Sequence, residues 1–252
     1  MSMINNEIPS DSEFKEIRES WRIKMGESEL LRNKAIELTI LSDKYKYGYQ
    51  WEWCGVPIIR HPDDIVLQQE IIWSLKPSHI IETGIARGGS LVLSWSLLQI
   101  CVGQGKVLGL DNKILDHTVQ KLKPWLDNEQ ICIYEGDSTS TEALAHVKKF
   151  LENNTTPVLI VLDSDHTHSH VLNELNSFAP LLPIGSIIIV ADTIIEEMPI
   201  DYYQNRSWTR GNNPLTALNS FLEINSNFKR DERWSRRSLM GEFRDGIVIK
   251  IT

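Results

Sequence analysis

Apolar residues in this chain fall into short runs that alternate with amphipathic segments of helical period. Five apolar runs rich in β-branched residues have the length of strands, near 79–83, 106–111, 130–135, 157–163 and 186–191. Helical patterns lie between them, around 89–102, 114–126, 140–152 and 168–179. This regular alternation predicts a parallel sheet with helices on both faces.

Two of the runs, Val158–Leu162 and Ile187–Val190, are apolar at every position. Uninterrupted apolar strands are typical of the centre of a parallel sheet, where helices cover both faces. Near the C-terminus, Ser238–Phe243 and Gly246–Ile251 flank a short polar turn with glycines nearby, which predicts a closing hairpin. The expected fold class is therefore α/β and Rossmann-like, with a mostly parallel sheet and an antiparallel C-terminal edge.

The first 60 residues follow a different pattern. Residues 1 to about 45 are charged, and their apolar residues are spaced for one or two amphipathic helices. The aromatic stretch 45–53 is typical of a strand, a lid over a pocket or an oligomer contact. Pro62 and the two aspartates after it predict the start of a helix that ends near Pro77. We therefore expect a helical and aromatic N-terminal extension over 1–60 and the main domain over 61–252.

Composition and charge narrow the functional classes. The chain has 252 residues and a formal net charge of −8, which disfavours nucleic acid as a main partner. Its three cysteines, Cys54, Cys101 and Cys132, include no C-x-x-C pair, as is typical of a reducing compartment. We find no signal-peptide core and no apolar run of membrane-spanning length. These features predict a cytoplasmic protein without a membrane span.

The segment His79–Ser90 carries the strongest functional signal. A β-branched strand reaches Glu82, turns through Gly84 and leads to Gly88 and Gly89, which open an apolar helix. Glycines let a backbone approach a ligand closely, and a helix N-terminus offers free N–H donors. The spacing differs from the dinucleotide fingerprint, and Glu82 would suit the amino group of an amino-acid-like ligand better than a pyrophosphate. The segment therefore favours S-adenosylmethionine, with an ordinary strand-to-helix turn as the alternative.

Acidic residues follow the next two predicted strands. Asp111 lies roughly 20 residues after Gly89, the distance at which an acidic residue meets ribose hydroxyls in nucleotide-binding α/β folds. Asp137 follows the third strand, where it would flank an adenine. A single aspartate in such a place is usually a turn or helix cap. Two at matching positions strengthen the cofactor interpretation.

A second acidic pair, Asp163 and Asp192, ends the fourth and fifth strands. Two carboxylates on adjacent strands can hold Mg²⁺ or Ca²⁺, which would orient a bound hydroxyl and lower its pKa. The alternative is that both only cap the segments after them. His166, just beyond the fourth strand, is a candidate general base. A zinc site with His168 and His170 is disfavoured, because no cysteine accompanies the histidines and their spacing does not converge.

Four segments together resemble the cephalosporin hydroxylase family: Pro62–Asp64 with the helix after it, Ile80–Ser90, Leu162–Val171 and Gly211–Pro214. The resemblance extends from about Trp51 to Asp231. It implies the fold of class I S-adenosylmethionine-dependent methyltransferases, with a seven-stranded sheet. It also implies kinship with sugar O-methyltransferases, including rhamnosyl ones.

For the cofactor, the resemblance implies Glu82 and Gly84 at the methionine end, Asp111 at the ribose and Asp137 near the adenine. The full cofactor-binding set that we predict also includes Arg87, Gly88, Ser90 and Asp163.

For the metal, the resemblance implies Asp163 and Asp192 as Mg²⁺ ligands. His166 would be the catalytic base, by analogy with catechol-type methyltransferases. Relatives often carry a second acidic residue before the last ligand, where this chain has Ala191. That departure would weaken the ion or shift a ligand role to Thr193 or Asp165.

The expected activity is Mg²⁺-dependent methyl transfer from S-adenosylmethionine to a hydroxyl of a sugar or sugar-bearing natural product. A non-catalytic partner subunit that supports another biosynthetic enzyme is the alternative, motivated by Ala191. Hydroxylation with non-haem iron needs two histidines and a carboxylate as ligands. It is disfavoured because the pattern predicts a parallel sheet and offers a pair made of carboxylates alone. Gly211–Pro214, with Trp208 and Arg210, would shape the acceptor pocket or only cap a helix. The N-terminal helices and three tryptophans indicate a homo-oligomer (Trp21, Trp51 and Trp53).

Overall fold

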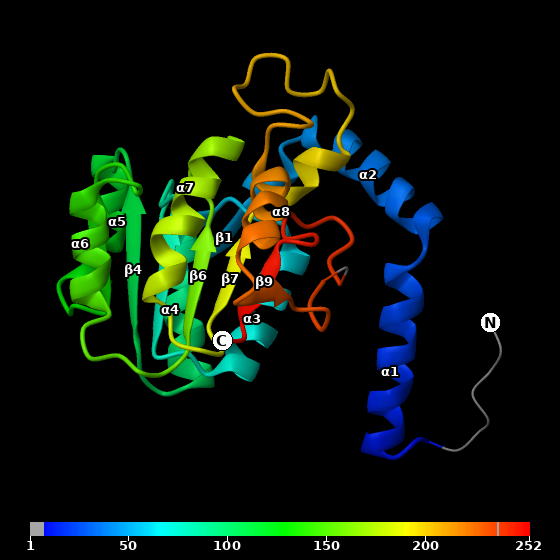
Figure 1. The fold of residues 1–252 in the computed structure, drawn as a ribbon, viewed down its shortest axis with the longest axis horizontal. Coiled ribbons are helices and arrows are strands. Elements are labelled where there is room, and N and C mark those ends of the chain that lie inside the picture. The colour runs from blue at the N-terminus through cyan, green and yellow to red at the C-terminus, as the bar shows by residue number, and fades with distance from the viewer. Residues whose placement is uncertain (1–7, 236) are drawn as a thin grey trace.

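A seven-stranded sheet forms the centre of the protein (Figure 1). The computed structural model of the chain describes residues 8–235 and 237–252. The strand order is β5-β4-β3-β6-β7-β9-β8. The strands are β3 (His79–Thr83), β4 (Lys106–Asp111), β5 (Ile131–Glu135), β6 (Val158–Leu162), β7 (Ile187–Val190), β8 (Phe228–Arg230) and β9 (Ile247–Lys250). The five strands β3 to β7 are neighbours in the sheet and pair in parallel, as their apolar runs predicted.

The antiparallel edge differs from the predicted hairpin. Strand β9 runs antiparallel to both β7 and β8, so an antiparallel edge exists. However, its partner is β8 rather than Ser238–Phe243, which is not a strand. The reason is that Asp63 and Asp64 accept hydrogen bonds from the main-chain N–H groups of residues 240–242, which are then not available to a ladder.

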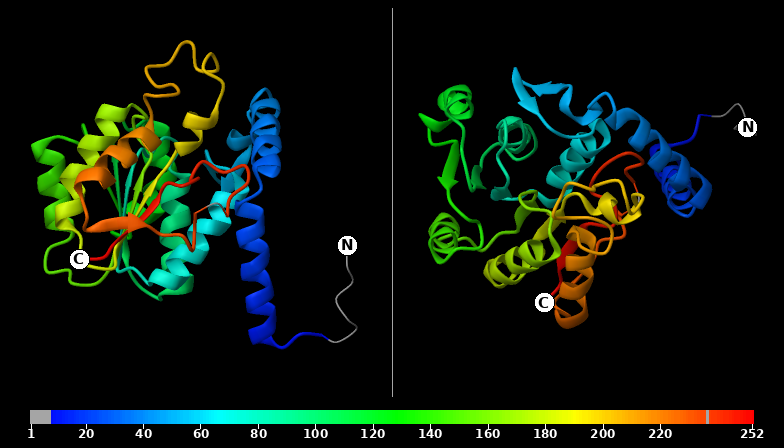
Figure 2. Two further views of the ribbon diagram at one scale, coloured as in Figure 1. Left: turned by 45° about the vertical axis from the view of Figure 1, so that its right-hand side comes forward. Right: turned by 90° about the horizontal axis from the view of Figure 1, so that it is seen from above.

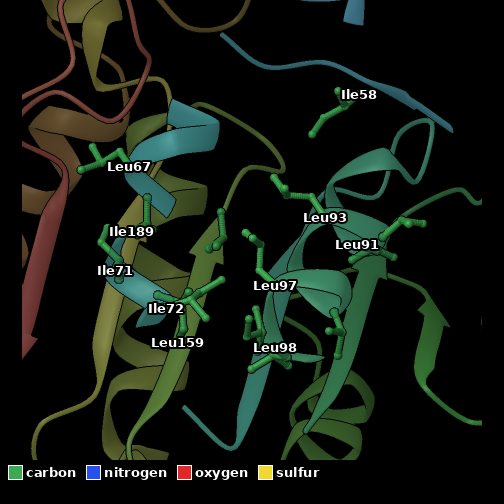
Figure 3. Close-up of a cluster of buried hydrophobic side chains, with 14 of the residues drawn as sticks. Ile58, Leu67, Ile71, Ile72, Leu91, Leu93, Leu97, Leu98, Leu159 and Ile189 are labelled. Carbon is green, nitrogen blue, oxygen red and sulfur yellow. The ribbon is translucent and has the colours of Figure 1, made fainter. Parts of the chain in front are cut away.

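Helices cover both faces of the sheet and enclose two hydrophobic clusters (Figure 2). The first cluster includes residues of α3 (Pro62–Leu75), α4 (Gly89–Cys101) and α5 (Asp116–Leu126). Figure 3 shows part of it, including Ile71 of α3, Leu97 of α4 and Leu159 of the central strand β6. The second cluster includes residues of α6 (Thr141–Phe150), α7 (His168–Phe178) and α8 (Pro214–Ile224). Burial of β6 and β7 on both faces explains why these strands have no polar alternation.

The N-terminal segment forms two helices and a small hairpin beside this domain (Figures 1 and 2). They are α1 (Asp11–Gly26), α2 (Glu29–Asp43), the short helix η1 (Tyr47–Tyr49) and strands β1 (Trp51–Trp53) and β2 (Val56–Ile58). None of the residues of α1 is buried, and Trp21 on it is exposed. In contrast, Ile58 of β2 joins the first hydrophobic cluster. The predicted division at residue 60 and the predicted homo-oligomer stay predictions.

The remaining short helices are η2 (Ala179–Leu181) and η3 (Thr193–Glu197). Between η3 and α8, residues 198–213 form a long loop that rises above the sheet (Figures 1 and 2). Within the part of the chain that the structure describes, no helix combines the length and apolar character needed to cross a bilayer.

Candidate active site

A cavity of about 600 Å³ opens where the parallel strands end. Its wall includes nine of the ten residues that the sequence predicted for the site: Gly84, Arg87, Gly88, Ser90, Asp111, Asp137, Asp163, His166 and Asp192. They meet there because the carboxyl ends of parallel strands lie at one edge of a sheet. The predicted site is therefore one continuous cavity, and only Glu82 is absent from its wall.

The glycine turn after β3 is shaped by the neighbouring strand. Gly84 has a φ of +89°, and a Cβ atom there would lie 1.9 Å from the main-chain oxygen of Asp163. Glycine is thus required at this position for the close passage of the chain after β6. Gly88 lies before the first residue of α4 with a left-handed backbone, and no side chain caps the helix. The N-terminus of α4 therefore faces the cavity with N–H donors that no capping side chain occupies.

Asp111 fixes the shape of this turn from the adjacent strand. Its Oδ2 accepts hydrogen bonds from the N–H groups of Ile85 at 2.8 Å and Ala86 at 3.1 Å. Its Oδ1 accepts from the N–H of Lys113. The carboxylate thus lines the cavity and also holds the backbone of the turn in place.

Asp137 shapes the next turn around the cavity. Its Oδ1 accepts from the N–H and the hydroxyl of Thr139, both at 2.8 Å. These hydrogen bonds hold the pKa of Asp137 below its usual value. Asp137 is therefore a turn residue, and it also lies in the cavity wall.

Glu82 lies beneath the cavity rather than in its wall. It is fully buried, and its Oε1 is 3.7 Å from Nη2 of Arg60, which is also fully buried. Burial raises the pKa of Glu82, and the charge of Arg60 together with the hydroxyls of Ser90 and Ser94 opposes that effect. Glu82 is therefore part of an internal charge network below the floor of the cavity.

Asp163, His166 and Asp192 meet at one point of the cavity. Each can offer a ligand atom, and these atoms lie within 4.8 Å of one another. His166 Nδ1 is 3.3 Å from Asp192 Oδ2. Asp192 has a φ of +55°, in the left-handed region that aspartate adopts more readily than most residues, and its side chain makes no capping hydrogen bond. The missing hydrogen bond argues against the alternative that Asp192 only caps the segment after it.

Several ionisable side chains lie close together around Asp163. Burial, and secondarily the charge of Asp192, raises the pKa of Asp163 to about 7. Arg60 opposes this, since its Nη2 donates to Asp163 Oδ2 at 3.2 Å. A cation bound between the two aspartates would relieve their mutual repulsion.

Two residues of the site were missed by the sequence reasoning. Arg60 precedes α3 and carries no motif, so nothing in the sequence marked it. Glu242 lines the cavity from the loop before β9, within the segment that was predicted to be a strand. Burial, then the charges of Asp192 and Asp163, raises the pKa of Glu242 well above its usual value. The only sequence signal for the position of Glu242 is the pair Asp63 and Asp64. These residues hold the loop of Glu242, whereas the sequence pattern predicted only that they start a helix.

Aromatic and basic side chains form the outer rim of the cavity. Tyr203, Arg206 and Trp208 come from the long loop 198–213 and line it. The ring of His166 meets Trp208 edge-on, with centroids 4.8 Å apart. In contrast, Gly211–Pro214 caps a helix: Asn213 accepts from the N–H groups of the first turn of α8.

Neither His168 nor His170 shares a metal site with His166. His168 Nδ1 lies 2.9 Å from the hydroxyl of Thr216, and His170 Nε2 is 3.4 Å from Glu174. Thr193 is fully buried, and its hydroxyl donates to the main-chain oxygen of Glu242. The structure thus gives Thr193 a structural role.

Sequence and structure comparisons identify the relatives of this chain. The family described as "Rhamnosyl O-methyltransferase/CmcI" matches residues 45–251. The rhamnosyl O-methyltransferase of Mycobacterium leprae is 30% identical over 62% of this chain and 68% of its own length.

Two solved structures of CmcI share the fold. The apo structure of CmcI has a TM-score of 0.61 and 20% identity, over 81% of this chain and 77% of that one. CmcI described with Mg and SAM has a TM-score of 0.58 and 19% identity, over 81% and 78% of the two chains. The family match covers most of the chain and includes Asp111, Asp137, Asp163, His166 and Asp192 of the cavity wall. The chain therefore belongs to the rhamnosyl O-methyltransferase/CmcI family and is by class an S-adenosylmethionine-dependent O-methyltransferase.

Proposed function

We propose that this protein methylates a hydroxyl of a sugar or sugar-bearing natural product, with Mg²⁺ held by Asp163 and Asp192 and with His166 as the base. The observation that carries the proposal is the meeting of these three side chains within 4.8 Å in the wall of the glycine-turn cavity. A methyl donor and a hydroxyl acceptor held together there would need little more than orientation and removal of one proton.

The cavity suits S-adenosylmethionine in size and lining. Its volume of about 600 Å³ is within the range of small-molecule and cofactor sites. The uncapped N-terminus of α4 would face the carboxylate of the amino-acid portion. Asp111 and Asp137 line the same cavity and would meet the ribose and the adenine. Glu82 would act from below, through its contact with Ser90 and its charge on Arg60.

The acidic pair suits Mg²⁺ in chemistry. Mg²⁺ prefers oxygen ligands and is usually bound by one or two carboxylates, with waters and substrate oxygens completing the shell. Asp163 and Asp192 provide two carboxylates from adjacent strands. When bound, the ion would orient the acceptor hydroxyl and lower its pKa.

His166 is placed to take the proton of that hydroxyl. Its Nδ1 lies 3.3 Å from Asp192 Oδ2, which would orient the ring and leave Nε2 for the acceptor. Trp208 packs edge-on against the ring and limits its rotation. Arg60 holds Asp163 from the buried side and balances part of the negative charge.

A sugar acceptor is supported by the rhamnosyl O-methyltransferases among the relatives. The rim residues Tyr203 and Trp208 would cover the acceptor, because both line the cavity and their loop rises above the sheet. A cytoplasmic homo-oligomer remains our prediction for the working form.

Calorimetric titration of S-adenosylmethionine and S-adenosylhomocysteine, followed by a Mg²⁺-dependent screen of sugar acceptors, tests the proposal. We expect micromolar binding of both compounds and turnover that EDTA abolishes. Cofactor binding without turnover on any acceptor, and without Mg²⁺ affinity, would instead favour the non-catalytic partner suggested by Ala191. Absence of binding of either compound would refute the proposal.

A further inference from the structure

The direction of β9 brings a third chain segment to the metal edge. Strands β6 and β7 end at Asp163 and Asp192, and β9 pairs with β7 in the antiparallel sense. Because β9 is antiparallel, its first residue lies at the edge where β7 ends. The register places Ile247, at the start of β9, opposite Ile189 near the end of β7. The loop that precedes β9 therefore arrives beside Asp192.

Glu242 in this loop is held there through its main chain. Its N–H donates to Asp64 Oδ2 at 2.6 Å. Its main-chain oxygen accepts from both the N–H and the hydroxyl of Thr193, at 3.1 and 3.0 Å. Thr193 follows Asp192 directly, so Glu242 is tied to the neighbour of a predicted metal ligand. Both anchors use main-chain atoms of Glu242 and leave its carboxylate free to face the cavity.

The carboxylate of Glu242 lines the same cavity as Asp163 and Asp192 but lies outside the 4.8 Å group that they form with His166. Across residues 8–235 and 237–252, no side chain hydrogen-bonds it. Asp192 and Asp163 are the charges that act most strongly on it. Three carboxylates in the wall of one cavity, with Arg60 as the opposing buried cation, are an arrangement that a divalent ion would stabilise.

We propose that Glu242 supplies the third carboxylate of the metal site, joining Asp163 and Asp192 from the loop before β9. This inference rests on the proposed function, because it assumes a divalent ion at the two aspartates. A third carboxylate raises affinity for a divalent cation through ligand charge. It also makes the metal site depend on the fold of the C-terminal segment as well as on the two central strands.

Asp165 is the nearest alternative on the same edge. It lines the cavity, but its Oδ1 accepts from the N–H of Thr167 at 2.8 Å, and its pKa is lowered by that contact as well as by the Thr167 hydroxyl. Asp165 thus has a local partner, whereas no side chain in the described part of the chain hydrogen-bonds the Glu242 carboxylate. This contrast makes Asp165→Asn a matched control for Glu242→Gln.

A metal titration independent of turnover tests the inference. Mn²⁺ is added to the full-length protein with saturating S-adenosylhomocysteine, free Mn²⁺ is followed by electron paramagnetic resonance, and Mg²⁺ is used as a competitor. We expect Glu242→Gln to weaken binding by roughly tenfold or more and Asp165→Asn by less than about threefold. Glu242→Asp, which keeps the charge on a shorter side chain, should fall between them. Affinity for S-adenosylhomocysteine reports that each variant is folded.

The two proposals fail in different ways. If Glu242→Gln binds Mn²⁺ like the wild type while Asp163→Asn does not bind it, the inference about Glu242 is overturned and the metal site at the aspartates stands. If the wild-type protein binds S-adenosylhomocysteine but no Mn²⁺, both are overturned. If Glu242→Gln does not fold, wild-type affinity in Glu242→Asp overturns the inference, and a loss of several-fold supports it.

Discussion

Nη2 of Arg60 lies 3.2 Å from Oδ2 of Asp163, and the Arg60 side chain is completely buried. The same guanidinium is 3.7 Å from Glu82 and donates to Oε1 of Gln68 at 2.5 Å. Arg60 therefore links the floor of the cavity to the acidic point where Asp163, His166 and Asp192 meet. The site is organised around a buried cation that lies outside every motif recognised in the sequence.

Replacing Arg60 with Met should destabilise the protein strongly. Removing one partner of a buried ion pair leaves Glu82 and Asp163 without their opposing charge, a loss of about 3–5 kcal/mol. Urea unfolding would measure it. The control is Lys123→Ala, whose pair with Asp127 is exposed and should contribute no more than about 0.5 kcal/mol. A loss below about 1 kcal/mol in Arg60→Met would contradict the role of Arg60 as the charge balance of the site.

Asp163→Asn should separate cofactor binding from turnover. Loss of a proposed Mg²⁺ ligand removes several kcal/mol of charge stabilisation, so we expect kcat to fall roughly 100-fold or more. The affinity for S-adenosylmethionine, measured by calorimetry, should change little. Asp127→Asn, on the surface between α5 and β5, is the control. An Asp163→Asn variant that lost cofactor affinity but kept its rate would show that the metal assignment is wrong.

His166→Gln should lower kcat by about 10² to 10⁴, the usual contribution of a general base. Its affinity for S-adenosylhomocysteine should stay within about twofold of the wild type, because a base acts on the acceptor. His168→Gln is the matched control, since His168 bonds Thr216 away from the cavity wall. Equal rates in both variants would remove His166 from the mechanism.

Gly84→Ala should disrupt the site through the backbone. The added Cβ would meet the main-chain oxygen of Asp163 at 1.9 Å, so the turn after β3 or the chain after β6 must shift. Gly103 has a similar φ of +87° but nothing within 4 Å of such a Cβ, so Gly103→Ala carries the conformational strain alone. We expect a loss of about 1–2 kcal/mol for Gly103→Ala and clearly more for Gly84→Ala in thermal or urea unfolding. Equal losses would show that close passage of the two chains is not the constraint.

Stability should fall as the pH rises from about 4 to 7, partly because of Asp64. Burial, and then the charge of Asp63, raises the pKa of Asp64 to about 7 from a model-compound value of 3.8. The folded state therefore holds a proton that the unfolded state releases, and the stability from this group is present below pH 4 and lost as the pH approaches and passes 7. Asp64 would account for up to about 4 kcal/mol of the fall in unfolding free energy over this pH range.

Asp64→Asn isolates this contribution. The amide oxygen can still accept from the N–H of Glu242, but the side chain no longer titrates. Urea unfolding at a series of pH values should give a flatter profile for the variant than for the wild type. Identical slopes would show that Asp64 does not carry a proton in the folded protein near pH 6.

The chain pattern by itself determined most of the fold. Apolar runs with β-branched residues predicted β3 to β7 within a residue or two, because buried central strands tolerate little else. It also determined that Asp111, Asp163 and Asp192 would share one cavity, since the ends of parallel strands necessarily meet at one edge. His166 followed from its position just beyond β6.

Only the tertiary structure decided the rest of the site. Glu82 ends in the interior rather than in the cavity wall, because Arg60, from the segment before α3, lies beneath the floor and pairs with it. Glu242 reaches the cavity wall because β9 is antiparallel and because Asp63 and Asp64 hold the loop before it. The contacts of Asp63 and Asp64 join residues 178 positions apart, and local pattern carries no information about which charges from separate segments will be buried together.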